Sequence, residues 1–307
     1  MFNYLAFGIP VISEIELPAL IPMRDHPVAT QPVYVRLGTV PCQLSKEGSN
    51  PDSCAFCNAH EMIYTIPDKI KFFIANGEEI IIEPIHPNYS ANLIYFYSNC
   101  LAAILYQRNL IPFHVSGVFT QPGKVALFAA PSGTGKSTLA VKLQELDFKP
   151  FTDDTAVLFI KNEKCFAQAS YPMMRLWQNT LKEQALLSEN DKERLYEEDE
   201  IDKFGFSFHE EFPTEAAEVE KIIFLREEGD EINISPINGS KMFAQLADNV
   251  YRCHWIPALQ KNVLQFNLIS EILNTVPCFL ATRPKNANTI NDFPAAIKNS
   301  LNNGKII

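Results

Sequence analysis

The chain has comparatively little positive charge. Among its 307 residues, 26 Lys and Arg stand against 36 Asp and Glu, which gives a net charge of −10. An acidic chain is poorly suited to binding the phosphates of nucleic acids or an anionic membrane surface. We therefore expect neither a nucleic acid nor a membrane as a partner.

The distribution of charged and apolar residues indicates neither a signal peptide nor a membrane span. The start of the chain lacks a basic region, and Glu14 and Glu16 interrupt its early apolar residues. The longest uncharged stretch with helical character, residues 88–107, contains several Asn and Ser side chains that are costly inside a bilayer. We expect this stretch to be a helix buried between layers and the protein to be cytoplasmic.

The cysteines form no evident disulfide framework. There are seven, an odd number, and five are scattered, which indicates a reducing compartment. The exception is Cys54 with Cys57, followed by His60 and preceded by Cys42, a group that could bind zinc. The spacing from Cys42 matches no zinc pattern, so free thiols are favoured and metal binding is left open.

The length suits two domains. Residues 1–88 are rich in strand signals: residues 33–38 alternate like a half-buried strand, and two apolar runs around Asn76-Gly77 predict a hairpin over 70–82. Residues 89–307 form the second predicted domain. Hairpins outnumber strand–helix–strand crossovers there, so an α/β fold with a mixed sheet is expected.

Individual elements of the second domain follow from the same signals. Helices are predicted at 90–109, 137–146, 178–202, 240–250, 258–274 and 293–301, and strands at 111–119, 125–129, 155–160, 165–169 and 276–281. A further hairpin is predicted between 222–225 and 232–234. The acidic run at 197–200 is interpreted as a solvated face.

A glycine-rich phosphate loop is the most informative motif. It follows an apolar strand, opens a helix and reads Ala130-Pro131-Ser132-Gly133-Thr134-Gly135-Lys136-Ser137, with Thr138 next. Glycines let such a loop bend so that its amides point inward, and the helix N-terminus adds partial positive charge. We expect residues 132–138 to bind the nucleotide, with Lys136 on the outer phosphates and Ser137 on Mg²⁺. Ala130 replaces the usual first glycine and is still small.

Two carboxylates follow closely. Asp153 and Asp154 come sixteen residues after Ser137, between an apolar segment and a predicted strand. A carboxylate there could hold Mg²⁺ through water or accept the proton of an attacking hydroxyl. On a regular extended segment the two side chains point to opposite faces. Capping of backbone amides by one of the two is the alternative.

One histidine lies on the strand that precedes the phosphate-loop strand. His114 begins that strand, and hairpin geometry brings it near the mouth of the loop if the register allows. A single histidine of this kind is more often structural than catalytic.

His114, the phosphate loop and the close aspartate pair together resemble the HPr kinase/phosphorylase family, which shares its fold with phosphoenolpyruvate carboxykinase. The rest of the chain is similar to one branch, the kinases of lasso-peptide precursors. The segments that carry this similarity are Ala6-Phe7-Gly8, Ser13-Glu14, Leu17-Pro18, 101–108 with 112–114, Arg175-Leu176-Trp177, Asp202-Lys203-Phe204 and Arg283-Pro284. The glycine-rich signature that follows the aspartates in classical HPr kinases is absent, so HPr itself is not implied as the substrate.

The resemblance implies an ATP- and Mg²⁺-dependent serine kinase with a P-loop kinase core and a small β-rich N-terminal domain. One aspartate would serve as base and the other would assist the metal; Asp154 is our first choice for the metal beside Ser137. His114 would lie beside the aspartate that serves as base and tune its carboxylate. Arg175, Lys203 and Arg252 are weaker candidates for contacting phosphate or peptide, and surface ion pairs are an equal alternative.

The acceptor predicted from the resemblance is a Ser or Thr hydroxyl of a precursor peptide. A small-molecule kinase using the same site and a nucleotide-binding accessory protein without turnover are the alternatives. The β-rich region is expected to hold the peptide, for example by strand addition to an exposed edge, or only to complete the core. Surface substitutions around the 70–82 hairpin are expected to weaken peptide binding in the first case. The sequence leaves homo-oligomerisation open.

Overall fold

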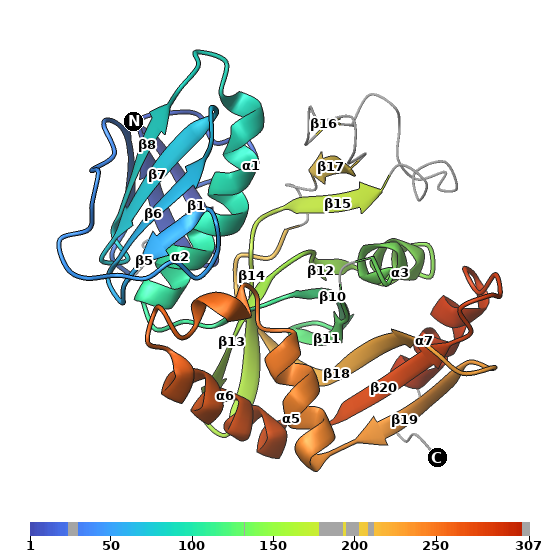
Figure 1. The fold of residues 1–307 in the computed structure, drawn as a ribbon. Helices are drawn as coiled ribbons and strands as arrows, with labels where there is room; N and C mark the ends of the chain where they lie inside the picture. The colour runs from blue at the N-terminus through green and yellow to red at the C-terminus, as the bar shows by residue number, and fades with distance from the viewer. Residues whose placement is uncertain (24–29, 132, 178–192, 195–202, 208–211, 303–307) are drawn as a thin grey trace.

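Two large β-sheets joined by a helical segment form the fold (Figure 1). The computed structural model describes residues 1–23, 30–131, 133–177, 193–194, 203–207 and 212–302, and of these only the backbone of 174–177, 193–194 and 203–207. The helix predicted over 178–202 therefore lies almost wholly outside the described residues. Within it, Glu193–Arg194 form the short strand β16, so the helix prediction is wrong at these two positions, which pair with a neighbouring strand instead.

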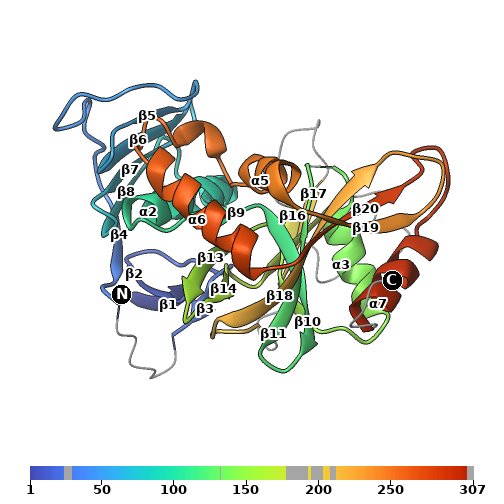
Figure 2. The same cartoon turned by 90° about the horizontal axis from the view of Figure 1, so that it is seen from below.

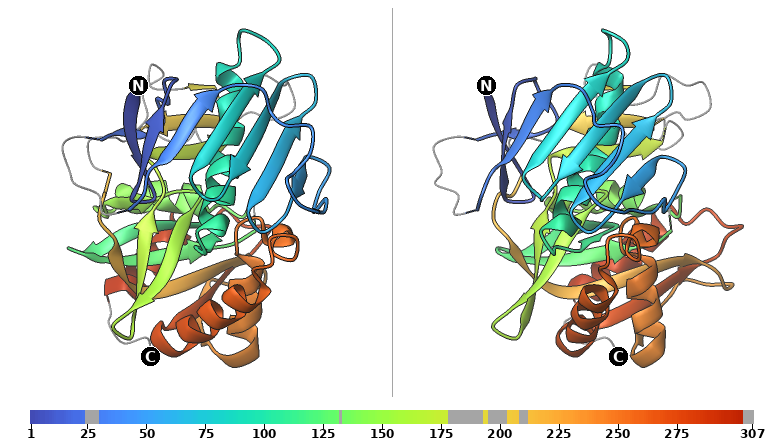
Figure 3. Two further views of the ribbon diagram at one scale, coloured as in Figure 1. Left: turned by 90° about the vertical axis from the view of Figure 1, so that its left-hand side faces the viewer. Right: turned by 60° about the vertical axis from the view of Figure 1, so that its left-hand side comes forward.

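The N-terminal sheet is mixed, and all of its strands lie within the first 84 residues (Figure 3). Its strands are β1 (Phe2–Ala6), β2 (Ile9–Ser13), β3 (Ile21–Pro22), β4 (Val33–Leu37), β5 (Ala55–Cys57), β6 (Glu61–Ile66), β7 (Ile70–Ala75) and β8 (Glu79–Pro84). They lie side by side in the order β3-β1-β2-β4-β8-β7-β6-β5. The strand expected at 33–38 is confirmed as β4.

The hairpin predicted around Asn76-Gly77 is also confirmed. β7 and β8 pair antiparallel, and Asn76 and Gly77 have φ of 55° and 69°, the left-handed conformation that such turns require. Both strands lie inside the sheet, because β7 also pairs with β6 and β8 also pairs with β4. Neither strand of this hairpin therefore has a free edge to which a peptide strand could be added.

A helical segment covers the N-terminal sheet and leads into the second. It comprises η1 (Ser90–Asn92), α1 (Leu93–Tyr95), the π-helical turn η2 (Phe96–Cys100) and α2 (Leu101–Gln107), which confirms the buried helix expected at 90–109. Asn99 Nδ2 donates a hydrogen bond to the Tyr64 hydroxyl at 2.8 Å, and Gln107 Nε2 donates to the Ile74 carbonyl at 3.1 Å. One continuous buried cluster runs from the N-terminal strands through this helix into the second sheet.

The second sheet carries the phosphate loop. Its strands are β9 (Pro112–Phe113), β10 (Val115–Gln121), β11 (Lys124–Ala129), β12 (Pro150–Thr152), β13 (Ala156–Lys161), β14 (Lys164–Ala169), β18 (Ala217–Glu227), β19 (Asn233–Ile237) and β20 (Cys278–Arg283). β11, β18 and β20 run parallel, and the other pairs of strands in this sheet are antiparallel, so the predicted mixed sheet is confirmed. A separate small sheet has the order β15-β17-β16, with β15 at Met173–Trp177 and β17 at Lys203–Ser207.

β18 is the central strand of this sheet. Its apolar run 222–225 is buried on both faces of the sheet, as expected for a central strand. Ile222 and Phe224 belong to the cluster that includes helices α5 (Gly239–Asp248) and α6 (Asn262–Thr275). Ile223 and Leu225 belong to the cluster on the other face, with α3 (Lys136–Gln144) and α7 (Asp292–Asn302). Helices thus cover both faces of this part of the sheet (Figure 2).

Two sequence expectations for this sheet are wrong. The hairpin between 222–225 and 232–234 does not form, because β20 pairs with β18 on one side and with β19 on the other. The single strand expected at 111–119 is split at His114: β9 pairs with β13, whereas β10 pairs with β11 and β12. Among the described residues, no helix has the length and apolar character needed to cross a membrane.

Candidate active site

The phosphate loop connects the end of β11 to the start of α3, as its sequence predicts. Gly133 and Gly135 have φ of 85° and 94°, a backbone region that side-chain-bearing residues rarely adopt. At Gly133 a Cβ atom would meet nothing within 4 Å, so the backbone angle, and not space, requires glycine there. Gly135 is the N-cap of α3 and makes no side-chain capping bond, and the first amides of a helix lack intrahelical acceptors.

Lys136 is buried inside the curve of the loop. Its Nζ donates to the carbonyl oxygens of Ala130 at 2.6 Å and Pro131 at 3.5 Å, and only 6% of the residue is exposed. Burying a charged group is costly unless it is hydrogen-bonded, and the two carbonyls meet that requirement. The ammonium group is therefore fixed beside the loop backbone.

Ser137 contacts the first aspartate of the pair. Its hydroxyl donates to Asp153 Oδ1 at 2.9 Å, and the hydroxyl of Ser116, on β10, donates to the same oxygen at 2.5 Å. Asp153 is 1% exposed and Ser116 is fully buried. The carboxylate beside Ser137 is thus that of Asp153, whereas the sequence led us to choose Asp154 for this position.

Asp154 faces the histidine instead. Its Oδ1 lies 3.8 Å from His114 Nε2, and both side chains are partly exposed. Asp154 has φ of 71°, so the chain does not continue as a regular strand through the pair. This left-handed residue lets the two carboxylates turn toward different partners.

The backbone around His114 is held by a segment far along the chain. The His114 amide donates to the Asn249 carbonyl at 2.7 Å, and the Tyr251 amide donates to the Pro112 carbonyl at 2.8 Å. The rings of His114 and Tyr251 meet edge to face with centroids 6.0 Å apart. His114 therefore lies between Asp154 and the 249–251 segment.

A cavity of about 290 Å³ opens beside the loop. It is lined by Gly133, Thr134, Gly135, Thr138, Leu139, Lys142, Arg283, 287–290, Phe293 and Pro294. Arg283 donates from Nη2 to the Thr134 carbonyl at 3.4 Å and to Glu227 Oε1 at 2.5 Å. Its guanidinium also lies 5.7 Å from the centroid of the Phe293 ring.

Sequence reasoning did not assign Ser116 or Arg283 to the site. Ser116 is two residues after His114, and residues two apart lie on the same face of a strand. On the single strand predicted at 111–119, this spacing could have placed Ser116 on the same side as His114. Arg283 ends β20, a strand parallel to β18 and, through it, to β11. Ligands of parallel sheets bind beyond the carboxyl ends of the strands, and that rule could have identified Arg283.

The remaining candidates have varied placements. Thr138 lines the cavity, and Ser132 lies outside the described residues. Arg175 and Lys203 are on β15 and β17, where only the backbone is described. Arg252 is next to Tyr251: its guanidinium lies over the Tyr251 ring at 5.3 Å and the Trp255 ring at 5.8 Å, and its buried Nε has no hydrogen-bond partner among the residues that the structure describes.

The cysteine group does not form a metal centre with neighbouring ligands in the described part of the chain. No three His, Cys, Asp or Glu side chains come together there in a way that could hold a metal ion. Burial raises the pKa of the Cys57 thiol to about 12, so this thiol is protonated at neutral pH. Cys42 is exposed, and Cys54 is half-buried.

Similarity to known proteins was found among solved structures. No family model matches the chain, and no curated protein matches it. The solved structure of the Hpr(Ser) kinase/phosphatase from Coxiella burnetii is similar, with 11% sequence identity over 62% of this chain and 95% of that one. The TM-score is 0.31, so the similarity is distant.

Proposed function

We propose that this chain is an ATP- and Mg²⁺-dependent kinase that transfers the γ-phosphoryl group to a Ser or Thr hydroxyl of a peptide. The observation that carries the proposal is the pair of carboxylates at the phosphate loop. Asp153 accepts a hydrogen bond from Ser137, and Asp154 lies beside His114. A loop that only binds nucleotide has no need of a second carboxylate paired with a histidine.

The nucleotide's phosphates would bind to the loop amides and to Lys136. The positive φ angles of Gly133 and Gly135 fit a backbone cradle, and the uncapped start of α3 favours an anion. Lys136 would exchange its two carbonyl acceptors for phosphate oxygens. The cavity beside the loop, with Arg283 and Phe293 in its lining, is the natural place for the nucleoside.

The residues on the other side of the loop fit a magnesium ion. Mg²⁺ prefers oxygen ligands and is usually held by one or two carboxylates together with substrate phosphates and water. The Ser137 hydroxyl and the Asp153 carboxylate supply hard oxygen atoms 2.9 Å apart. When bound there, the ion would neutralise charge on the phosphates. Ser116 would keep Asp153 in place through its hydrogen bond to Oδ1.

Asp154 would accept the proton of the attacking hydroxyl. It is partly exposed, so an acceptor can reach it, and His114 lies 3.8 Å away. A base must come within hydrogen-bond reach of the proton that it removes, and a mobile peptide hydroxyl can meet an exposed carboxylate more easily than the buried Asp153. Positioning and charge neutralisation would supply most of the catalysis.

The acceptor is supported by the sequence resemblance alone. We propose a lasso-peptide precursor, and a cytosolic location on the basis of the reducing environment that the unpaired cysteines indicate. Peptide docking at the β-rich N-terminal region stays part of this proposal, away from the β7–β8 hairpin.

The test is direct phosphoryl transfer. The purified protein is incubated with Mg²⁺-ATP and a precursor peptide encoded beside its gene, and the peptide is weighed by mass spectrometry. We expect a gain of about 80 Da, one phosphoryl group, on a Ser or Thr residue. Lys136→Ala should abolish the gain, and Lys164→Ala, which changes an exposed ion pair with Glu218, should not.

Other outcomes separate the alternatives. ATP turnover that labels a small hydroxyl compound but no peptide would favour a small-molecule kinase. Tight ATP binding without any γ-phosphoryl transfer, tested across peptide and small-molecule acceptors, would contradict the kinase assignment and favour an accessory protein.

A further inference from the structure

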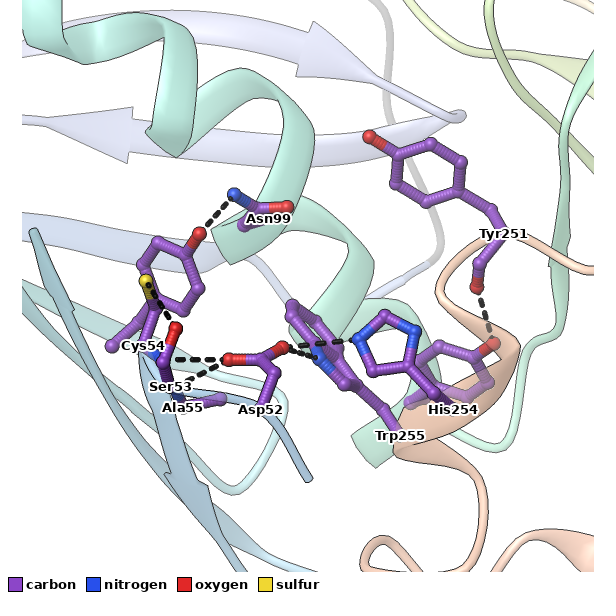
Figure 4. A network of polar contacts seen from close by, with 10 residues as sticks. Asp52, Ser53, Cys54, Ala55, Asn99, Tyr251, His254 and Trp255 are labelled. Carbon is purple, nitrogen blue, oxygen red and sulfur yellow. Dashed lines mark hydrogen bonds and ion pairs between the residues drawn. The ribbon is translucent and has the colours of Figure 1, made fainter. Parts of the chain in front are cut away.

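Asp52 links the N-terminal region to the second half of the chain (Figure 4). One carboxylate oxygen accepts hydrogen bonds from the amides of Cys54 at 2.8 Å and Ala55 at 2.9 Å. The other oxygen is bonded to His254 Nε2 at 3.0 Å and accepts a hydrogen bond from Trp255 Nε1 at 2.6 Å. A single side chain thus joins the start of β5 to residues about 200 positions later.

The segment that Asp52 holds is the one that supports His114. Tyr251 packs its ring against His114, and its carbonyl accepts a hydrogen bond from the Tyr106 hydroxyl at 2.6 Å. Arg252 follows with φ of 56°, a strained angle for a residue with a side chain, and its guanidinium lies between the rings of Tyr251 and Trp255. Trp255 is fully buried, so the distal end of the segment is fixed.

These contacts form a continuous chain from Asp52 to the site. It runs through Trp255, Arg252 and Tyr251 to His114, which faces Asp154. The links are one hydrogen bond, two guanidinium–ring contacts, one ring–ring contact and the 3.8 Å approach of His114 to Asp154. If the Asp52 end is released, the Tyr251 ring loses one of its supports.

We propose that Asp52 is a positioning residue that sets the placement of His114 from the N-terminal region. Its catalytic consequence rests on the proposed kinase function, whereas its effect on the His114 ring does not. The carboxylate itself touches none of the reacting groups. Its role is to hold the 251–255 segment so that the Tyr251 ring orients the imidazole toward Asp154.

The experiment compares Asp52→Asn with the unaltered protein in two readouts. The first is the NMR signal of the His114 ring in protein labelled at histidine, assigned by loss of that signal in His114→Gln. The ring current of the neighbouring Tyr251 side chain acts on the imidazole, so a displaced segment should move the signal. The second readout is steady-state phosphoryl transfer. We expect a shifted His114 signal and kcat lowered about tenfold with KM for ATP unchanged, since misplacing a catalytic group by about 1 Å can cost on the order of 100-fold.

Two further variants keep the test decisive. His254→Ala removes one bond to Asp52 from a partly exposed ring, so it should fold and should give the same changes at smaller size. Glu83→Gln is the control: Glu83 accepts from the Val40 amide and pairs with Lys71, all within the N-terminal sheet region, and neither readout should change.

An unmoved His114 signal in a folded Asp52→Asn or His254→Ala variant overturns the inference, whatever the protein catalyses. A moved signal with unchanged kcat overturns the catalytic role. If the unaltered protein transfers no phosphoryl group, the proposed function fails while the NMR comparison still decides whether Asp52 positions His114.

Discussion

The hydroxyl of Ser137 donates a hydrogen bond to Asp153 Oδ1 at 2.9 Å, which joins the first turn of the phosphate-loop helix to the aspartate pair sixteen residues later. Asp154, the next residue, turns away from Ser137 and lies beside His114. The two aspartates are therefore neighbours in sequence with different partners, and their loss should have different consequences.

Asp153→Asn should raise the Mg²⁺ concentration needed for half-maximal rate by about tenfold, because a negative charge is lost beside Ser137. Asp154→Asn should leave that concentration unchanged and lower kcat by roughly 100-fold or more, the usual contribution of a general base. Titration of Mg²⁺ against rate for both variants checks this. Superimposable magnesium curves, after scaling to the same maximum, would show that the division between metal and base is wrong.

Ser116→Ala should act like a weaker form of Asp153→Asn. Removal of the hydroxyl takes one of two serine hydrogen bonds from a buried carboxylate, which costs about 1 kcal/mol or more in stability. We expect a several-fold higher magnesium requirement together with a lower free energy of unfolding in urea. Ser98→Ala, which removes a hydroxyl bonded to the Ile94 carbonyl within the helical segment, is the control and should leave the magnesium requirement unchanged.

Arg283→Ala should weaken nucleotide binding more than chemistry. The guanidinium lines the cavity and contacts the loop at the Thr134 carbonyl, and a hydrogen bond to a charged group contributes about 1.5–3 kcal/mol. We expect KM for ATP to rise about tenfold with kcat within a factor of about two. Arg226→Ala is matched, because Arg226 is on the same sheet and bonds to Gln245. An equal rise in both variants would exclude a specific role for Arg283.

The stability contributed by Asp52 should depend on pH. Burial opposes its ionisation, but hydrogen bonds from Trp255, Cys54, His254 and Ala55 outweigh burial and lower its pKa from 3.8 to about 2. A lowered folded-state pKa stabilises the protein above the unfolded value, and this contribution is lost as pH falls from about 4 to about 2.

The difference in unfolding free energy between the unaltered protein and Asp52→Asn should therefore shrink over that range. Urea unfolding at pH 7 and at pH 2.5 measures it. An equal difference at pH 7 and at pH 2.5 would mean that the carboxylate is not stabilised in its charged form.

Local signals in the sequence predicted local structure well. The Asn76-Gly77 turn, the β13–β14 hairpin and the helix that opens at Lys136 depend on residues close in the chain, and all are present. The mistaken hairpin after 222–225 has a long-range cause: β20, more than fifty residues later, competes for the edge of β18. No local pattern reveals such a competitor.

The same distinction between local and long-range contacts applies to the site. The phosphate loop was predicted from its motif, and its proximity to the aspartate pair followed from one hairpin and one helix. Which residues pair within that group depends on the left-handed turn at Asp154, and the sequence does not signal this turn. The pairs are Ser137 with Asp153 and His114 with Asp154. The link from Asp52 to Trp255 depends on tertiary packing alone.

The most direct test of the central claim is phosphoryl transfer by Lys136→Ala, measured together with thermal unfolding. Under the proposed function, the loop lysine would neutralise charge on the transferred group, and loss of one such contact typically lowers the rate by roughly 100- to 1,000-fold. We predict a loss of that size in a protein that unfolds cooperatively near the temperature of the unaltered chain. Near-normal rates in a well-folded Lys136→Ala variant would contradict the assignment of this loop as the catalytic phosphate site.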